Sequence, residues 1–278
     1  MTGGEGFVYA ATGERYVREA MRSRETLRRH HPSHPVLLFT DRADVVPAGA
    51  FDDVIELPAQ QWKRSSSKVW ALGRSPFDKT VYLDTDVHVV GDLADLFRVL
   101  DRFDAAGVPM ELRVQRLPGH ADDARIPDAF MSVNAGVLAY RRNDATAELF
   151  ARWAELYEAD RATAKVIQDQ PSLRAALWES RCSLLLLPPE FNMRTIRGAS
   201  YPNVAVGTVR VIHGRVPDLA RLERRWNRTT EPRLLTPLPG YVGRVTARRV
   251  LGARAYDRLR AVQLRRSRTR GGVAKPAE

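Results

Sequence analysis

The sequence predicts an α/β protein with a mostly parallel central sheet flanked by helices. Short apolar segments that suit strands alternate along the chain with longer segments in which apolar residues recur at helical spacing. With 278 residues, of which 44% are hydrophobic, the chain can build a substantial core. Because no internal repeat is visible, we expect one main domain rather than a repeat array.

The first hundred residues are expected to alternate between strands and helices. The segment F-V-Y-A-A predicts a strand at 7–11, and Thr12 and Gly13 form the turn to a helix at 16–30. Further strands are expected at 35–40, 51–57 and 81–83, and further helices at 67–72 and 92–100.

The pattern continues with strands and amphipathic helices up to about residue 212. The helix at 144–158 is strongly amphipathic, with Leu149, Trp153 and Tyr157 on its inner face. The remaining elements are strands at 105–109, 134–140, 184–187 and 209–212 and a helix at 170–178.

The positive charge of the chain is concentrated near its C-terminus. The formal net charge is +11, yet the first 220 residues carry 28 basic and 29 acidic residues, whereas the last 58 carry 16 and 4. This distribution argues against a nucleic-acid-binding protein as a whole. We therefore expect a main domain at 1–225 and a basic extension at 226–278, helical or partly disordered.

Several sequence features indicate a cytoplasmic protein. No apolar run is long enough to span a bilayer, and the first ten residues lack the regions of a secretory signal. A single cysteine, Cys182, excludes an internal disulfide and a cysteine-based zinc site. Arginine outnumbers lysine by 39 to 5, which is typical of a GC-rich bacterial genome.

Two aspartates, Asp84 and Asp86, follow the apolar strand at 81–83. Residues i and i+2 of an extended chain point to the same side, so both carboxylates can converge on one object. Ligands of α/β sheets bind beyond the carboxyl ends of strands, and Mn²⁺ or Mg²⁺ prefers carboxylate oxygens. Solvation in a loop, or pairing with a nearby arginine, is the alternative explanation for these charges.

Several segments around these aspartates resemble a known family in order and rough spacing. The segments are K-T-V-Y-L-D-T-D-V-H-V-V-G-D-L-A-D-L-F at 79–97, S-S-S-K-V-W-A-L at 65–72, S-V-N-A-G-V-L-A-Y at 132–140, Q-D-Q-P-S-L at 168–173, L-P-P-E-F-N-M at 187–193 and I-H-G-R at 212–215. The resemblance is to the glycogenin-like, family eight glycosyltransferases of the GT-A fold, and it covers about residues 7 to 215.

This resemblance implies a metal-dependent enzyme that transfers a sugar, with retention, from a nucleoside diphosphate sugar, most often UDP-linked. Asp86 and His213 would bind Mn²⁺ or Mg²⁺ directly, with Asp84 between the metal and the ribose. Lys68 would reach the diphosphate. Arg215 would take the phosphate role of a lysine that the family has after its late histidine.

The resemblance also implies positions around the nucleotide and the sugar. Ala10, Thr12 and Tyr16 fall where the family holds uracil and ribose, although T-G-E at 12–14 departs from its usual Thr-Asn-Asp. The sugar and its anomeric carbon would face three further residues: Asn134, Asp169 and Gln170.

Structural explanations compete for several of these residues. A lone histidine such as His213 is more often a core or surface residue than a ligand, and Lys68 suits a helix surface. Asn134 could cap a turn, and Asp169 suits the N-cap of the helix that contains Pro171.

The acceptor and the role of the basic extension are less constrained. A carbohydrate, a glycolipid or a small molecule could be the acceptor, because the segment 111–127 diverges from the family. Leu251, Ala255, Leu259 and Val262 share a helical face among arginines, which favours peripheral contact of residues 242–270 with anionic lipid at the inner face of the membrane. A solvated tail is the alternative, and no nucleic acid is expected.

Two other functions are alternatives to sugar transfer. A nucleotidyltransferase that makes activated sugars needs a glycine-rich phosphate loop after the first strand, whereas A-A-T-G-E-R has one glycine. A non-catalytic protein that binds membranes or polyanions through the basic extension is the other alternative.

Overall fold

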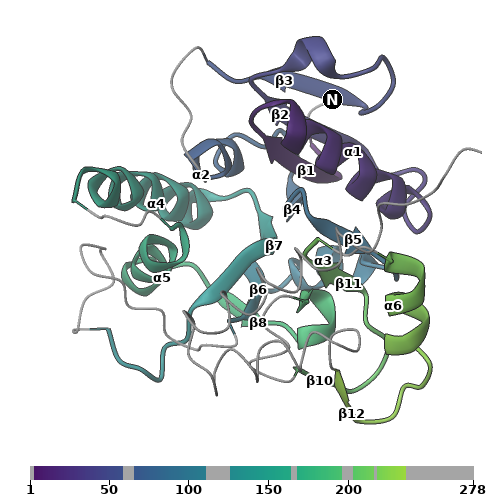
Figure 1. Ribbon diagram of the computed structural model, residues 1–278. Coiled ribbons are helices and arrows are strands. Elements are labelled where there is room, and N and C mark those ends of the chain that lie inside the picture. The colour runs from purple at the N-terminus through teal and green to yellow at the C-terminus, as the bar shows by residue number, and fades with distance from the viewer. Residues whose placement is uncertain are drawn as a thin grey trace, which may run out of the picture.

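The computed structural model describes residues 3–58, 66–110, 126–163, 168–195, 203–215 and 218–235 (Figure 1). The segment expected to contact the acceptor lies mostly outside these residues, as does the expected membrane-binding helix at 242–270.

A seven-stranded, mostly parallel sheet forms the centre of the molecule. Its strand order is β3-β2-β1-β4-β7-β6-β8. β1 pairs in parallel with β2 and β4, and β7 is antiparallel to both of its neighbours. The carboxyl ends of β1, β2, β3 and β4 therefore meet at one end of the sheet. The strands are β1 (Glu5–Ala11), β2 (Val36–Thr40), β3 (Asp53–Glu56), β4 (Lys79–Leu83), β6 (Ala105–Pro109), β7 (Val133–Arg141) and β8 (Leu184–Leu186).

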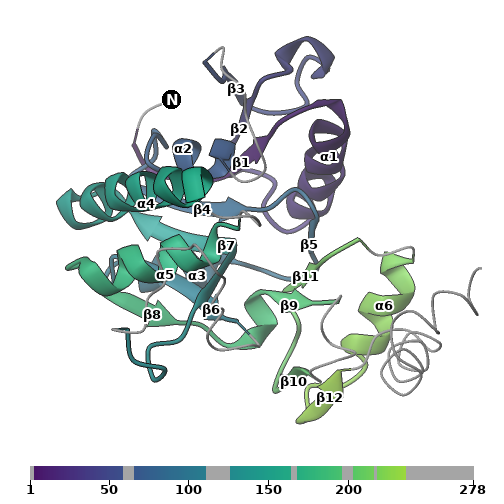
Figure 2. The ribbon, with the colours of Figure 1, turned by 60° about the vertical axis from the view of Figure 1, so that its left-hand side comes forward.

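Helices cover both faces of this sheet, which is why its central strands are apolar along their whole length (Figure 2). Side chains alternate between two cores: Phe7 and Tyr9 pack on one face, and Val8 and Ala10 pack on the other. The first face is covered by α1 (Glu14–Arg28) and α3 (Ala94–Val99). The second is covered by α2 (Ser66–Leu72), α4 (Asp144–Thr163) and α5 (Gln170–Glu179).

A smaller sheet lies beyond the carboxyl end of β4. It has the order β5-β11-β9, with β11 antiparallel to β5 and parallel to β9. The bounds are β5 (Val87–Val89), β9 (Met193–Arg194) and β11 (Val211–His213). Since β5 follows β4 after a short turn, this sheet brings the end of β11 next to Asp84 and Asp86.

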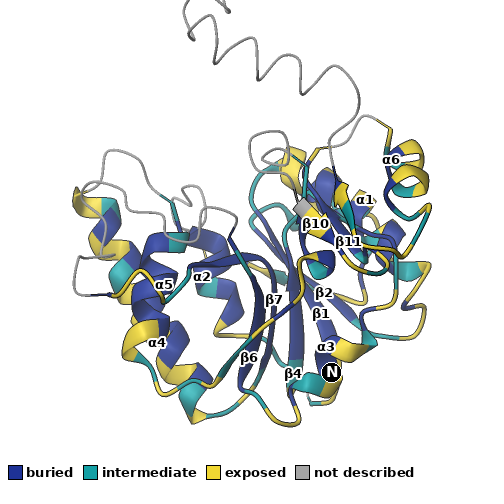
Figure 3. Ribbon diagram, turned by 90° about the horizontal axis from the view of Figure 1, so that it is seen from below, coloured by how far each residue is buried: buried dark blue, intermediate teal, exposed yellow. Residues whose placement is uncertain are grey.

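A third cluster of buried residues joins the smaller sheet to the last described elements. It contains Ile212 from β11, Leu222 and Trp226 from α6, and Leu235 from the β10–β12 ribbon. The burial pattern of the helices and strands is drawn in Figure 3. The elements are α6 (Leu219–Trp226), β10 (Asn203–Ala205), β12 (Arg233–Leu235) and the 3-10 turns η1 (Ala43–Val45) and η2 (Pro189–Phe191).

The domain boundary expected at residue 225 stays a prediction, although buried packing continues beyond it to Leu235.

The expected α/β class and the mostly parallel sheet are confirmed. Every strand and helix predicted from the sequence is present within a few residues of its expected bounds, and the strand at 105–109 has those bounds. The sequence reasoning missed β5, β9, β10, β12 and α6. In the described parts of the chain, no helix combines the length and the apolar character needed to cross a bilayer.

Candidate functional site

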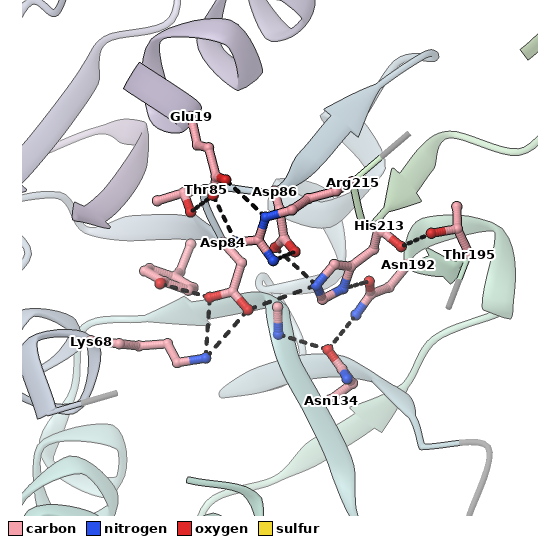
Figure 4. Close-up of polar contacts among 12 residues, drawn as sticks. Glu19, Lys68, Asp84, Thr85, Asp86, Asn134, Asn192, Thr195, His213 and Arg215 are labelled. Carbon is pink, nitrogen blue, oxygen red and sulfur yellow. Dashed lines mark hydrogen bonds and ion pairs between the residues drawn. The ribbon is translucent and has the colours of Figure 1, made fainter. Parts of the chain in front are cut away.

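Asp84 and Asp86 lie in the turn that joins β4 to β5, at the carboxyl end of β4 (Figure 4). Their backbones are fixed from two sides. The N–H of Asp84 donates to the carbonyl of Gly136 in β7 at 2.8 Å, and the carbonyl of Asp86 accepts from the N–H of Gly214 at 2.8 Å. The turn is therefore anchored to the central sheet and to the end of β11.

His213 completes a three-residue cluster with these aspartates. It is the last residue of β11 and is largely buried, at 8% exposure. Its Nε2 lies 3.3 Å from Oδ1 of Asp86 and 3.9 Å from Oδ2 of Asp84. One ligand atom from each of the three residues lies within 4.8 Å of the others, and no other such group occurs among the described residues. Two carboxylates and an imidazole make a donor set that suits a divalent metal ion.

A chain of amide hydrogen bonds fixes the orientation of the His213 ring (Figure 4). The backbone N–H of Gly136 donates to Asn134 Oδ1 at 2.9 Å, and Asn192 Nδ2 donates to the same oxygen at 3.0 Å. Asn192 must then present Oδ1 to His213 Nδ1, which lies 2.8 Å away. Because an amide oxygen only accepts, Nδ1 carries a proton and Nε2 is the nitrogen that faces the carboxylates. Such outer contacts commonly fix the tautomer of a metal-binding histidine.

Gly136 provides the space in which the His213 ring lies. A Cβ at this position would come within 2.2 Å of His213 Cε1 and 2.8 Å of Asn134 Oδ1. The ring therefore needs a residue without a side chain at position 136, which explains the glycine near the start of the predicted strand at 134–140.

Lys68 connects the aspartate pair to Asp169. The Lys68 side chain is buried on α2, with Nζ 3.1 Å from Asp84 Oδ1 and 2.7 Å from Asp169 Oδ2. Burial alone would lower the pKa of Lys68, but the charges of Asp169 and Asp84 outweigh burial and raise it. The lysine stays charged, and its ion pair with Asp169 connects the start of α5 to the site.

The side chain of Asp169 does not cap its helix. Asp169 occupies the N-cap position of α5 but makes no side-chain cap hydrogen bond, because its carboxylate pairs with Lys68 instead. Tyr82 supports the other carboxylate: its hydroxyl donates to Asp84 Oδ1 at 2.9 Å. Burial, together with the charge of Asp84, raises the pKa of Tyr82, so the phenol keeps the proton that it donates.

Three carboxylates gather at the centre of the site. They belong to Asp84, Asp86 and Asp169, and Lys68 pairs with the first and the last of them. Burial raises the pKa of Asp86, but hydrogen bonding to His213 and the charges of His213 and Arg215 outweigh burial and lower it to about 2. Since Asp86 stays ionised, it can serve as an anionic ligand of a divalent cation.

Arg215 is held at the rim of the site by a glutamate from α1. Its Nε and Nη2 donate to the two carboxylate oxygens of Glu19 at 2.8 and 2.9 Å, while Nη1 lies 3.7 Å from Asp86 Oδ2. Thr85 Oγ1 also donates to Glu19, at 3.3 Å. Glu19 therefore ties α1, the turn after β4 and the end of β11 together.

Lys68, Asp84, Asp86 and Arg215 line a pocket of about 540 Å³, within the range of small-molecule sites. Tyr16, which is 42% exposed, lies at its mouth and follows the Gly13 turn at the end of β1. The pocket is lined by Ala10, Thr12, Tyr16, Ser67, Lys68, Tyr82, Asp84, Thr85, Asp86 and Arg215. The six residues that the sequence assigned to nucleotide binding are all in this set.

The other candidate residues lie around the same centre. Asn134 is buried behind His213 and acts on the ring through Asn192, so the structure gives it a supporting contact rather than a pocket-lining position. Gln170 is the first residue of α5, directly after Asp169, and is half-buried.

The sequence analysis did not predict a role for three residues of the site. Glu19 lies on the buried face of α1, four residues before Ser23, so a charge on the inner face of an amphipathic helix could have revealed it. Tyr82 lies two residues before Asp84 on the same side of the strand. Asn192 was noted as part of a motif, without a role.

No family model matches this chain, and no curated protein matches it either. Solved structures do. An active-site mutant of LgtC is 18% identical with a TM-score of 0.55, and covers 81% of this chain and 94% of LgtC. LgtC, a galactosyltransferase in complex with donor and acceptor sugar analogs, is 20% identical with a TM-score of 0.55 and covers 77% of this chain and 88% of LgtC.

A third structure agrees with these two. The glycosyltransferase GlyE of Streptococcus pneumoniae TIGR4 is 18% identical with a TM-score of 0.54, and the alignment covers 84% of this chain and 58% of GlyE. The likeness to these glycosyltransferases confirms the predicted GT-A fold.

Proposed function

We propose that this protein is a metal-dependent glycosyltransferase that moves a sugar, with retention, from a nucleoside diphosphate sugar to an acceptor. A UDP-sugar is the proposed donor. The observation that carries the proposal is the cluster of Asp84, Asp86 and His213 beside a pocket at the carboxyl end of β4. That is where α/β sheets bind their ligands.

The donor set supports a divalent cation. Asp84, Asp86 and the Nε2 of His213 would hold Mn²⁺ or Mg²⁺, since their donor atoms converge and the imidazole turns Nε2 toward the carboxylates. Once bound, the cation would supply positive charge that stabilises the departing diphosphate.

Two cationic side chains support diphosphate binding beside the cation. Lys68 lines the pocket and remains charged between Asp84 and Asp169. Arg215 lines it from the opposite side and has N–H groups beyond those that Glu19 accepts. Both would bind phosphate oxygens and lower the cost of separating the diphosphate from the sugar.

Nucleoside and sugar would extend in opposite directions from the diphosphate. Ala10, Thr12 and Tyr16 would contact the base and ribose, with the exposed ring of Tyr16 as a stacking surface. Asp169 and Gln170 at the start of α5 would face the sugar. Asn134 is proposed to act in the reaction, and its contact with Asn192 supports an indirect contribution through His213.

The acceptor is proposed to be a carbohydrate, a glycolipid or a small molecule. A cytoplasmic protein whose residues 242–270 contact anionic lipid would meet a lipid-linked acceptor at the membrane, but these residues lie outside the described part of the chain.

Titration calorimetry with UDP, with and without Mn²⁺, tests the proposal, followed by a screen of nucleotide sugars for Mn²⁺-dependent hydrolysis. We expect UDP to bind more tightly with Mn²⁺ and at least one UDP-sugar to be cleaved. Asp86→Ala should abolish the effect of the metal, whereas Asp95→Asn, an exposed carboxylate on α3, should retain it. Absence of UDP binding in both conditions would exclude the proposed function.

A further inference from the structure

We infer that Glu19 is a positioning residue, which holds the Arg215 guanidinium in the orientation that receives the donor diphosphate. This inference rests on the proposed function and concerns how the same pocket binds the anionic part of its donor.

Glu19 is an unusual residue for its place in the fold. It projects from the inner face of α1 and is only 7% exposed. A buried carboxylate is costly unless it is paired and hydrogen-bonded. Here the Arg215 guanidinium satisfies it with two parallel hydrogen bonds at 2.8 and 2.9 Å, and the Thr85 hydroxyl adds one at 3.3 Å. Arg15 makes a further ion pair at 3.6 Å from the exposed side of the helix.

The geometry of this pair decides which edge of the guanidinium is available. Glu19 engages the edge formed by Nε and Nη2. Nη1 is thereby turned toward the pocket, where it lies 3.7 Å from Asp86 Oδ2 (Figure 4). The Arg215 side chain is 48% exposed, and its two hydrogen bonds to Glu19 are much shorter than its 3.7 Å contact with Asp86, so Glu19 is the group that fixes its orientation.

Fixing the arginine in advance favours binding of an anion. A flexible side chain loses conformational entropy when it contacts a ligand, and a side chain that is already ordered avoids most of that loss. The guanidinium has five N–H donors, so the edge facing Asp86 can contact phosphate while the other edge stays on Glu19. A lysine has no second edge, so this arrangement is specific to arginine.

The negative charge of Glu19 lies near the pocket, so it also repels an anionic ligand. The test must therefore separate position from charge. Glu19→Asp keeps the charge but is one methylene too short to hold both guanidinium nitrogens. Glu19→Gln removes the charge and keeps the length. Glu25→Gln, on an exposed position of the same helix, is the matched control.

The experiment is titration of each variant with UDP at saturating Mn²⁺, together with Mn²⁺ binding alone and thermal denaturation as a check of folding. We expect Glu19→Asp to weaken UDP binding roughly 3- to 10-fold, with Mn²⁺ binding unchanged and Glu25→Gln unaffected. In an Arg215→Ala background, Glu19→Asp should have no further effect, since Glu19 acts through Arg215.

Two results would overturn the inference while leaving the proposed function intact. One is wild-type UDP affinity in a folded Glu19→Asp variant. The other is an equal loss in the presence and absence of Arg215, which would indicate a general structural role. If Glu19→Gln also binds UDP more tightly, the first of these results means that Glu19 acts only through its charge. Failure of the wild-type protein to bind UDP at all would instead reject the proposed function.

Discussion

Replacing Gly136 by alanine should disrupt the cation site without replacing any of its proposed ligands. The new Cβ would lie 2.2 Å from His213 Cε1 and 2.7 Å from Nδ1, whereas ordinary contacts begin near 3.4 Å. The ring must therefore move by about 1 Å, and metal–ligand distances tolerate only about 0.2 Å. The backbone cannot yield easily, because Gly136 bonds to both Asp84 and Asn134.

We expect Gly136→Ala to weaken Mn²⁺ binding by roughly 10- to 100-fold, as for other changes in the surroundings of metal ligands. Overpacking should also lower the free energy of unfolding by about 1–3 kcal/mol. Electron paramagnetic resonance of free Mn²⁺ during a titration measures the affinity, and thermal denaturation measures the stability.

Gly73→Ala serves as the control for this variant, since a Cβ there would meet Phe150 at 3.3 Å, away from the site. It should bind Mn²⁺ like the wild type. If a folded Gly136→Ala protein binds Mn²⁺ as tightly as the wild type, His213 is not a ligand and the geometric reasoning is wrong.

Other predictions concern the groups around the cation. Asn192→Leu removes the acceptor for His213 Nδ1, so Mn²⁺ binding should weaken by roughly 10-fold or more and the ¹⁵N shift of Nδ1 should change; an unchanged Nδ1 shift would contradict the inferred Nδ1–H hydrogen bond. Lys68→Met leaves two carboxylates without their cation and should cost about 3–5 kcal/mol of unfolding free energy in metal-free protein, whereas a loss below about 1 kcal/mol would contradict a structural ion pair. Because the folded-state pKa of Asp86 is lowered to about 2, its stabilising contribution is present above the ordinary carboxylate pKa and is lost as pH falls toward 2. Chemical denaturation measures the free energy of unfolding at each pH. Between pH 5 and 2, this free energy should fall by about 2 kcal/mol less for Asp86→Asn than for the wild type. An equal fall for both proteins would contradict the lowered pKa.

The sequence predicted those features of the fold and the site that depend on residues close together in the chain. The apolar strand that ends in Asp84 and Asp86 predicted both the strand β4 and a carboxylate pair at its end. The short apolar runs predicted the strands, and the spacing of apolar residues in α4 identified its buried side. These features depend on neighbours in the chain, which is why they are visible without a fold.

Contacts between distant segments could not be obtained in this way. His213 lies more than a hundred residues after the aspartates, and only the resemblance to a family drew attention to it. The link from Glu19 to Arg215 and the amide chain through Asn192 depend on how β11 packs beside β5, which no local pattern encodes. The short strands β9, β10 and β12 have too few residues to show any periodicity.

The central claim is that Asp84, Asp86 and His213 together bind one divalent cation at the donor pocket. Crystals grown with Mn²⁺ and UDP, and measured at the manganese absorption edge, test it most directly. We predict one anomalous peak in contact with the two aspartates and with Nε2 of His213, with UDP phosphate oxygens bound to the same ion. A manganese peak elsewhere, or UDP bound with no ion between it and these three residues, would contradict the account.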